Sequence, residues 1–213
     1  MSRRHLPLVL IAAAWIASAL AWPELPDRMP VHWNVRGEVD GWGGRLEGTL
    51  LLPAVMVVLY GVFRLVPKID PRGANFARMA DTWELVIALV LALMLVIHFG
   101  ALAAGLGHQV PMGRIMPVAV GLVFIGLGNV LPRAKPNWVF GIRTPWTLSN
   151  DRVWARTHRL GGYTMVAGGV LMLGAAAAPA RWTFPLLAVG IGIAALIPTV
   201  YSYFAWRREA SSR

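Results

Sequence analysis

The stretch ELVIALVLALMLVIHFGALAAGL, residues 84–106, decides the fold class of this chain. Between its first residue, Glu84, and its last, Leu106, it contains no further Asp, Glu, Lys or Arg, and His98 is the one other titratable side chain. The hydrocarbon core of a bilayer is about 30 Å thick, and a helix needs about 20 mainly apolar residues to cross it. The stretch therefore predicts a transmembrane helix.

Five more stretches have the same apolar character: Leu6–Trp22, Gly48–Pro67, Ile115–Leu131, Leu160–Ala178 and Thr183–Trp206. The whole chain is 57% hydrophobic and 14% charged, whereas soluble domains are about 25% charged. We therefore predict an all-α integral membrane protein with six transmembrane helices, forming a single membrane domain over residues 1–213. Four tryptophans near the span ends, Trp22, Trp83, Trp182 and Trp206, are expected to form an interfacial aromatic belt.

The distribution of positive charge predicts the orientation. Fifteen of the twenty Lys and Arg residues fall on one side of the expected spans, and the other side carries Arg28, Arg36, Arg45, Arg114 and Arg181. Because cytoplasmic loops are enriched in Lys and Arg, we expect both termini to be cytoplasmic. The net charge of +10 is explained by these inner loops, so we expect no direct nucleic-acid partner.

The outer loop, residues 23–47, reads PELPDRMPVHWNVRGEVDGWGGRLE. Asp40-Gly41 is a turn signal, and two tryptophans argue against disorder. We expect a compact cap that contacts a ligand or partner through His32, Trp33, Asn34, Asp40 and Trp42. One histidine beside carboxylates supplies too few ligands for a typical zinc site, so we predict no metal and no cofactor.

The inner loop, residues 132–159, reads PRAKPNWVFGIRTPWTLSNDRVWARTHR. Pro145 excludes helix before it, and Ser149 or Asn150 has the character of an N-cap. A helix from about Asp151 into the fifth span places Trp154 and His158 on one face. The loop is either a solvated basic surface near anionic lipid or a structured site, and tryptophans between the arginines favour the structured site.

Arg143 is the strongest single candidate in the inner loop. Gly141 permits close backbone approach, and Thr144-Pro145 stiffens the turn, so the guanidinium can meet a phosphate, a carboxylate or an acidic partner. The alternative is a clamp on the C-terminal carbonyls of the fourth span. For His98, inside the third span, we favour an interhelical hydrogen bond over a functional role. Glycines of the last two spans indicate close helix packing.

The inner loop resembles the SdpI family of bacterial immunity proteins. The resemblance rests on Gly128-Asn129, Leu131-Pro132, Lys135-Pro136-Asn137, the run from Phe140 to Ser149, Val153-Trp154 and Thr157-His158-Arg159. It extends over residues 115–206. The outer loop, through His32-Trp33-Asn34 and Asp40-Gly41-Trp42-Gly43, is similar to a domain of unknown function, DUF1648, often fused before it. These matches add Asn129, Asn137, Thr144, Trp146, Trp154 and His158 to the candidate binding residues.

The resemblance implies a multi-pass protein of the bacterial cytoplasmic (inner) membrane. A member of that family protects the cell that makes a secreted, membrane-active peptide toxin, and it is thought to hold a repressor at the membrane. We therefore expect an immunity and signalling protein whose partners are membrane lipid, a peptide toxin on the outer face and a cytoplasmic repressor.

A short sequence pattern that occurs twice in the chain suggests a different function. Leu25-Pro26-x₃-Pro30 and Leu131-Pro132-x₃-Pro136 stand 106 residues apart, each after an expected span. Three spans between them place the copies on opposite faces, which is the topology of a 3+3 inverted repeat. The alternative function is thus a transporter or flippase of a small or lipidic anion. Motifs of hydrolases and metalloproteases are absent, so we expect no enzyme.

Overall fold

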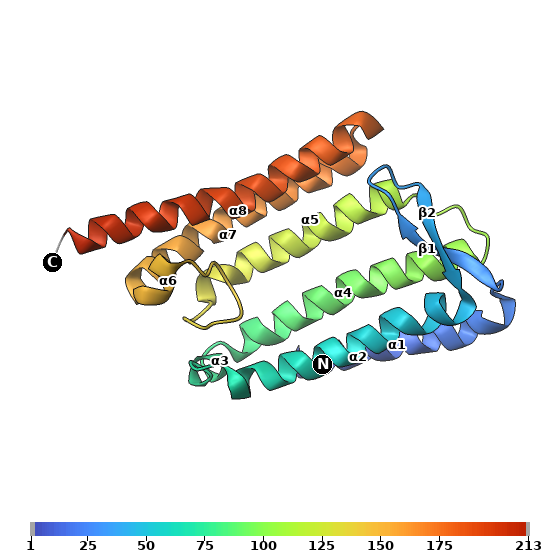
Figure 1. Ribbon diagram of the computed structural model, residues 1–213, viewed down its shortest axis with the longest axis horizontal. Helices are drawn as coiled ribbons and strands as arrows, with labels where there is room; N and C mark the ends of the chain where they lie inside the picture. Colours follow the sequence, from blue (N-terminus) through green and yellow to red (C-terminus); the bar gives the residue numbers. More distant parts are fainter. Residues whose placement is uncertain (1–2, 212–213) are drawn as a thin grey trace.

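The computed structural model describes residues 3–211 as a bundle of long helices lying side by side (Figure 1). The long helices are α1 (Leu6–Ala21), α2 (Arg45–Ile69), α4 (Ala80–Gly105), α5 (Met112–Val130), α7 (Asp151–Ala177) and α8 (Ala180–Ala210). Within the described residues these six are long and apolar enough to cross a membrane, which confirms the predicted fold class. α7 starts earlier than the fifth span because it continues from the inner loop, also as expected.

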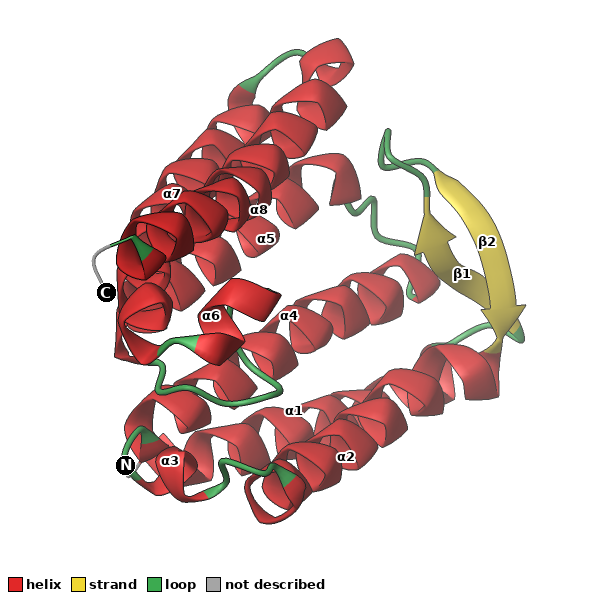
Figure 2. Ribbon diagram, turned by 60° about the vertical axis from the view of Figure 1, so that its left-hand side comes forward, coloured by secondary structure: helices red, strands yellow, loops and turns green. Residues whose placement is uncertain are grey.

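Short elements cover the two ends of the bundle. The strands β1 (Arg28–Trp33) and β2 (Val39–Gly44) form an antiparallel hairpin. The other short elements are the 3₁₀ turns η1 (Arg3–His5), η2 (Trp22–Glu24) and η3 (Leu131–Arg133) and the helices α3 (Ala74–Ala77) and α6 (Pro145–Ser149). Figure 2 shows both ends of the described chain beside α3 and α6, away from the hairpin. That the shared end faces the cytoplasm stays a prediction, as does the inverted repeat.

The two groups of basic residues separate between these ends. Arg28 and Arg36 belong to the hairpin, Arg45 begins α2 beneath it, and Arg114 and Arg181 lie in the first turns of α5 and α8. The loops and helix ends at the α3 and α6 end carry the larger group, of which Arg213 lies outside the described residues. The structure therefore offers one weakly basic and one strongly basic end, as the orientation argument requires.

The outer loop is a β-hairpin, and its turn is not at Asp40-Gly41. Both residues lie in β2, with Gly41 opposite His32. The turn forms instead at residues 34–38, where Asn34 Oδ1 accepts from the backbone N–H of Arg36 (2.8 Å) and of Glu38 (3.1 Å). The Asn34 side chain thus mimics a backbone turn, and this turn, not the Asp40-Gly41 pair, sets the register of the hairpin.

The hairpin is seated on the outer ends of the helices by glycines. Gly37 has a φ of +78° and its Cα faces the backbone of Gly113 at the start of α5, where a side chain would clash. Met29 is fully buried, and a Cβ at Gly48 or Gly105 would collide with its side chain. The hairpin therefore packs on α2, α4 and α5 rather than extending freely into solvent.

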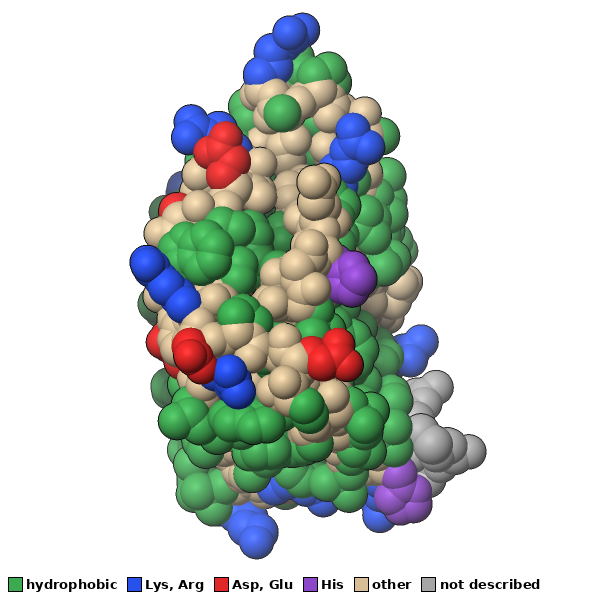
Figure 3. All heavy atoms as spheres, turned by 90° about the vertical axis from the view of Figure 1, so that its right-hand side faces the viewer, with side chains coloured by type: hydrophobic (Ala, Val, Ile, Leu, Met, Phe, Trp, Pro, Cys, Tyr) green, Lys and Arg blue, Asp and Glu red, His purple; other side chains and the backbone are tan. Residues whose placement is uncertain are grey.

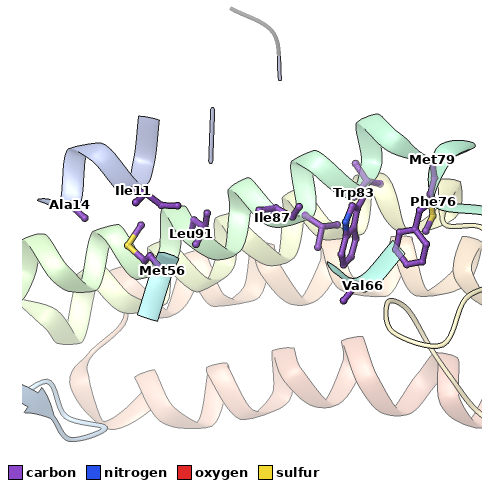
Figure 4. Packing of buried hydrophobic residues seen from close by; sticks show 11 residues of the cluster. Ile11, Ala14, Met56, Val66, Phe76, Met79, Trp83, Ile87 and Leu91 are labelled. Carbon is purple, nitrogen blue, oxygen red and sulfur yellow. The ribbon is translucent and has the colours of Figure 1, made fainter. Parts of the chain in front are cut away.

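The main apolar core follows α4 (Figure 4). Trp83 lies toward the α3 end of this core with 5% exposure, and the rings of Phe63 and Phe76 meet it edge-on at 5.6 and 5.0 Å. We expected Trp83 in an interfacial aromatic belt, and that expectation is wrong because the indole N–H donates to the Phe63 carbonyl (3.2 Å) inside the bundle. Trp22, Trp182 and Trp206 remain exposed near helix ends, as such a belt requires.

Glycine pairs bring α5 and α7 together. A Cβ at Gly121 would lie 2.8 Å from the Gly169 carbonyl oxygen, and one at Gly169 would lie 2.6 Å from that of Gly121. Gly128 and Gly162 repeat this reciprocal contact one heptad away, at 2.8 and 2.7 Å. Small residues of this kind let backbones approach closely in lipid.

Two glycines in the predicted packing set do not pack. Gly174 has open space where a side chain would be, and the nearest atom to a Cβ at Gly192 is in Leu196 of its own helix, 4.0 Å away. Both lie on helix faces turned from the neighbouring helices. In contrast, Gly168 and Gly190 face one another between α7 and α8, and a Cβ added at either would collide with the carbonyl oxygen of the other.

Gly169→Ala should destabilise the bundle by about 1–3 kcal/mol, because the new methyl overpacks the α5–α7 contact. The matched control is Gly174→Ala, which adds the same methyl to the same helix in open space. Thermal unfolding of the detergent-solubilised chain measures both. Equal melting temperatures for the two variants would show that close approach at Gly169 is not needed.

Candidate functional site

The inner loop folds into a compact structure, here called the inner cap, comprising residues 131–150 and the first two turns of α7. Asn137 is fully buried at its centre. Its Nδ2 donates to the carbonyls of Lys135 (2.9 Å) and Phe140 (3.0 Å), and its Oδ1 accepts from the N–H groups of Val139 (2.8 Å) and Phe140 (2.6 Å). All the ordinary hydrogen-bonding positions of this amide are thus used within the loop.

Trp154 and His158 hold the cap to α7. Their rings stack at 4.0 Å, and the Trp154 indole N–H donates to the Ala134 carbonyl (2.8 Å). His158 is fully buried, with Nδ1 2.8 Å from the Trp154 carbonyl and Nε2 3.0 Å from the Ile142 N–H. Because a carbonyl only accepts and an N–H only donates, this histidine is neutral with its proton on Nδ1.

The local sequence explains how the cap reaches His158 and starts α7. Gly141 has a φ of +113° and leaves no side chain between the backbone and the imidazole. Asn150 is the N-cap of α7, accepting from the N–H of Arg152 (2.8 Å) and Val153 (3.2 Å). The predicted cap residue, helix and shared face of Trp154 and His158 are confirmed.

A short helix, α6, joins the cap to α8. Thr144 is its N-cap and forms a capping box with Thr147. The Thr144 hydroxyl also lies 3.0 Å from the hydroxyl of Ser202 on α8, and Trp146 meets Tyr203 edge-on at 5.1 Å. The cap thereby bridges the inner ends of several helices.

Arg143 lies at the cap surface. Its Nη1 donates to the Trp138 carbonyl (2.6 Å) and not to the C-terminal carbonyls of α5, so the proposed clamp on the fourth span is wrong. The indole of Trp138 and the side chain of Val139 are exposed beside it, at 50% and 38%. We call these three residues the cap patch, which is the apolar and cationic surface that the cap presents.

Residues of the α2–α4 connection brace the cap, and sequence reasoning did not find them. Asp70 accepts from the Trp138 N–H (2.8 Å), and Asn75 donates to the Pro136 carbonyl (2.7 Å). Arg72 donates to the Leu148 carbonyl (3.2 Å) and to Asp151 (3.2 Å). These partners are 61–79 residues apart in the chain, so no local spacing connects them.

Basic residues of α7 are partly committed to internal pairs. Arg152 and Arg156 approach the two carboxylate oxygens of Glu209 on α8 at 2.8 and 3.2 Å, and that carboxylate is 8% exposed. Two of the loop's arginines therefore hold α8 in place. The inner loop is therefore a folded structure and not only a solvated basic surface, and its role as a binding site stays a prediction.

The outer hairpin carries the second group of candidates. His32 Nδ1 lies 2.6 Å from Asp40 Oδ1 in an exposed pair. Trp33 is half-buried, whereas Trp42 is 53% exposed with the Arg28 guanidinium 5.6 Å from its ring centroid. Figure 3, which views the hairpin end, shows hydrophobic side chains at the surface between charged ones. The hairpin's exposed large apolar residues are Val35, Val39 and Trp42, with Leu46 just beyond.

The hairpin turn is a small ionic network. The Asn34 amide and the Arg36 guanidinium each donate to Glu38 at 2.9 Å, and these hydrogen bonds lower the pKa of Glu38 below its usual value. A lowered pKa in the folded state means that this carboxylate contributes to folding above its normal titration range and loses that contribution as pH falls through the lowered pKa. Asn34 therefore stabilises the turn through both the oxygen and the nitrogen of its side-chain amide.

The predicted site residues divide between two ends of the molecule. Asn137, Arg143, Thr144, Trp154 and His158 come together in the inner cap, with Trp146 at its edge, and the hairpin residues lie at the far end. Asn129 joins neither group, because it is exposed on α5 and donates to the Ile125 carbonyl of its own helix (2.9 Å).

A buried polar contact links the helices between the two ends. Ser18 on α1 donates to the Thr49 carbonyl of α2 (2.7 Å), and its hydroxyl lies 2.9 Å from His98 Nε2 on α4. His98 is fully buried, so the interhelical hydrogen bond expected for it is confirmed. Within residues 3–211, no group of three or more His, Cys, Asp or Glu side chains is arranged to hold a metal ion.

Comparison with known proteins bears on both ends of the chain. Residues 133–202 match the model of the SdpI/YfhL protein family, and residues 9–57 match that of a domain of unknown function, DUF1648. The immunity protein SdpI of Bacillus subtilis is 24% identical over the full length of both chains. No solved structure matches the chain.

Two other relatives share only part of the chain. The uncharacterized membrane protein YbgB of Bacillus subtilis is 42% identical over 48 residues, which are 22% of this chain and 53% of that protein. An uncharacterized protein of Archaeoglobus fulgidus is 34% identical over 65 residues, or 30% of this chain and 35% of that protein.

Six apolar helices capped by polar structure at both ends define a multi-pass membrane protein, and similarity to the full-length Bacillus subtilis relative supports a bacterial one. Its resemblance to the SdpI family, with a DUF1648 region before the SdpI region, is confirmed by the two family models and by the full-length relative.

Asn137→Leu should destabilise the inner cap, because two N–H groups and two carbonyls lose their partner in a buried site. Each unpaired buried group costs about 1–3 kcal/mol. The matched control, Asn129→Leu, removes one bond within an exposed helix turn and should change little. Trypsin cleavage within the cap and thermal unfolding measure the effect, and a cap equally resistant in both variants would contradict it.

Proposed function

We propose that the chain is a membrane immunity protein that protects a bacterial cell from a secreted, membrane-active peptide. The observation that carries this proposal is the similarity to an immunity protein over the whole length of both chains. A shared local motif would support only a shared domain, whereas full coverage includes the hairpin, the spans and the inner cap. The proposed role is binding and needs no catalytic group.

The outer hairpin supports a role as the contact for the peptide. It lies at the end of the bundle opposite the inner cap and exposes Val35, Val39 and Trp42. Exposed apolar side chains among charged ones are typical of surfaces that bind proteins or membranes. The docking of Gly37 on Gly113 keeps the hairpin tip in one position, which reduces the ordering cost of binding.

Expression of the chain should protect a sensitive bacterium against at least one secreted membrane-active peptide, and Trp42→Ala should reduce that protection about tenfold or more, as for an aromatic residue central to an interface. The control, Trp182→Ala, removes an equally exposed tryptophan from the same end of the bundle but outside the hairpin. Survival across a panel of such peptides is the measurement. Unchanged survival with the wild-type chain would refute immunity, and equal protection by both variants would refute the hairpin contact.

We further propose that the cap patch contacts a cytoplasmic regulator. Trp138 and Val139 offer exposed apolar surface, and the Arg143 guanidinium has donors beyond the one that it gives to Trp138. An apolar patch beside an arginine suits an acidic, amphipathic segment of a partner protein. Asn137 and Asp70 accept hydrogen bonds from the backbone of the cap next to this patch, so the shape of the patch is fixed before a partner binds.

Trp138→Ser combined with Arg143→Gln should abolish peptide-induced transcription while leaving peptide resistance intact, because it removes the regulator's contact and not the hairpin. Trp206→Ser combined with Arg208→Gln is the matched control at the same end of the bundle. Transcript profiles of expressing cells, with and without peptide, measure the response. A normal response in the cap-patch variant, or an equal loss in the control, would count against the proposed contact.

A further inference from the structure

A hollow of about 360 Å³ opens at the α3 end of the bundle, and neither the inner cap nor the hairpin contributes a residue to its lining. Its walls come from η1, α2, α3 and the start of α4. The charged residues that line it are Arg4, Arg64, Lys68 and Glu84, and its aromatic lining is Phe63, Phe76 and Trp83. Its volume falls within the range of small-ligand sites.

Glu84 is the unusual residue of this hollow. It is 7% exposed and lies in an apolar helix, where an ionisable side chain is costly and by default has a role. Its Oε1 accepts from Arg64 Nη1 at 2.5 Å. Its Oε2 is buried, and no residue among 3–211 donates a hydrogen bond to it. A buried carboxylate oxygen without a donor is costly, so this oxygen is an acceptor position that an N–H group of a ligand can fill.

Two cations stand at the same hollow. Arg4 and Lys68 are exposed, and neither forms a salt bridge with any part of the chain that the structure describes. With Arg64 they give the hollow more positive charges than its one carboxylate can balance. The hollow therefore attracts an anionic group as well as a hydrogen-bond donor. The aromatic wall, centred on the buried Trp83, then suits apolar atoms between or beside these groups.

We propose that this hollow binds the headgroup of an ethanolamine phospholipid of the adjoining leaflet. The ammonium donates to Glu84 Oε2, and the phosphate lies between Lys68 and Arg4. The hollow sits at the ends of α2 and α4, which are transmembrane helices, and lipid headgroups lie at that depth. The acyl chains leave along the apolar helix surfaces, which a soluble ligand cannot use. This inference rests on the membrane fold and not on the proposed immunity function.

The chemistry separates ethanolamine from choline. Both headgroups carry the same phosphate and the same charge, but the trimethylated choline nitrogen has no N–H and cannot donate to Glu84 Oε2. A charge-assisted hydrogen bond of this kind is worth about a tenfold difference in affinity or more. Monomethyl and dimethyl ethanolamine lipids keep at least one N–H, so the main loss of binding should come with the third methyl group.

The test uses the full chain purified in detergent and native mass spectrometry with lipids of identical acyl chains. Wild type should bind the ethanolamine lipid about tenfold more tightly than the choline lipid, with the mono- and dimethyl forms between them. Equal binding of the ethanolamine and choline lipids would overturn the proposal. Soluble O-phosphoethanolamine at the same concentration should not displace the lipid, and displacement would overturn the lipid source.

Variants assign the two contacts separately. Glu84→Gln should bring the ethanolamine-to-choline ratio close to one, because the anionic acceptor is gone. Lys68 is exposed, so Lys68→Gln should fold normally; it should weaken the binding of both lipids while leaving the ratio of their affinities unchanged. This variant keeps the test decisive if Glu84→Gln does not fold. Arg78→Gln, a nearby exposed arginine that does not line the hollow, is the control and should change neither value. A ratio unaffected by Glu84→Gln would also overturn the assignment.

Discussion

Lipid provides no hydrogen-bond partners, and this constraint governs the whole structure. Every backbone N–H and C=O at membrane depth must be satisfied inside the protein, which in this chain means six long helices. Irregular backbone is confined to the two ends. The inner cap shows what irregular backbone requires, because a single buried amide, that of Asn137, satisfies four backbone groups of one loop.

The helices are held together by two different means. α5 and α7 approach through reciprocal glycine pairs, Gly121 with Gly169 and Gly128 with Gly162, so backbone packs on backbone. In the other half, α1, α2 and α4 pack through large side chains around Trp83 and share the buried hydrogen bonds of Ser18. Neither means relies on the hydrophobic effect, which does not drive association between helices within lipid.

The two polar ends differ in construction, and this suits different roles. The hairpin is a small, exposed element seated on helix ends, with its apolar and charged side chains facing outward. Backbone groups of the inner cap are satisfied within it, and Asp70, Arg72 and Asn75 from another part of the chain brace it, so the cap patch is presented on a fixed support. A small exposed contact at one face and a braced surface at the other fit a protein that meets different partners on the two sides of a membrane.

Sequence alone determined the class of fold, the six spans and the helix start at Asn150, because apolar length and capping are local properties of the chain. It also marked glycines of the last two spans as packing residues, but their α5 partners, Gly121 and Gly128, came only from the structure. It also placed Trp154 and His158 on one helix face, which follows from helical periodicity. The SdpI resemblance drew attention to Asn137 and Thr144, although it said nothing about how their side chains are used.

Only the tertiary structure decided the rest. The hairpin turn forms at Asn34 and not at Asp40-Gly41. Trp83 lies in the core and not at the membrane interface, and Arg143 bonds to its own loop. The hydrogen bond from the Trp138 N–H to Asp70 joins groups that are distant along the chain. The packing of distant segments also leaves the Glu84 Oε2 atom without a donor. Such contacts depend on which helices become neighbours, and no spacing within the sequence encodes that choice locally.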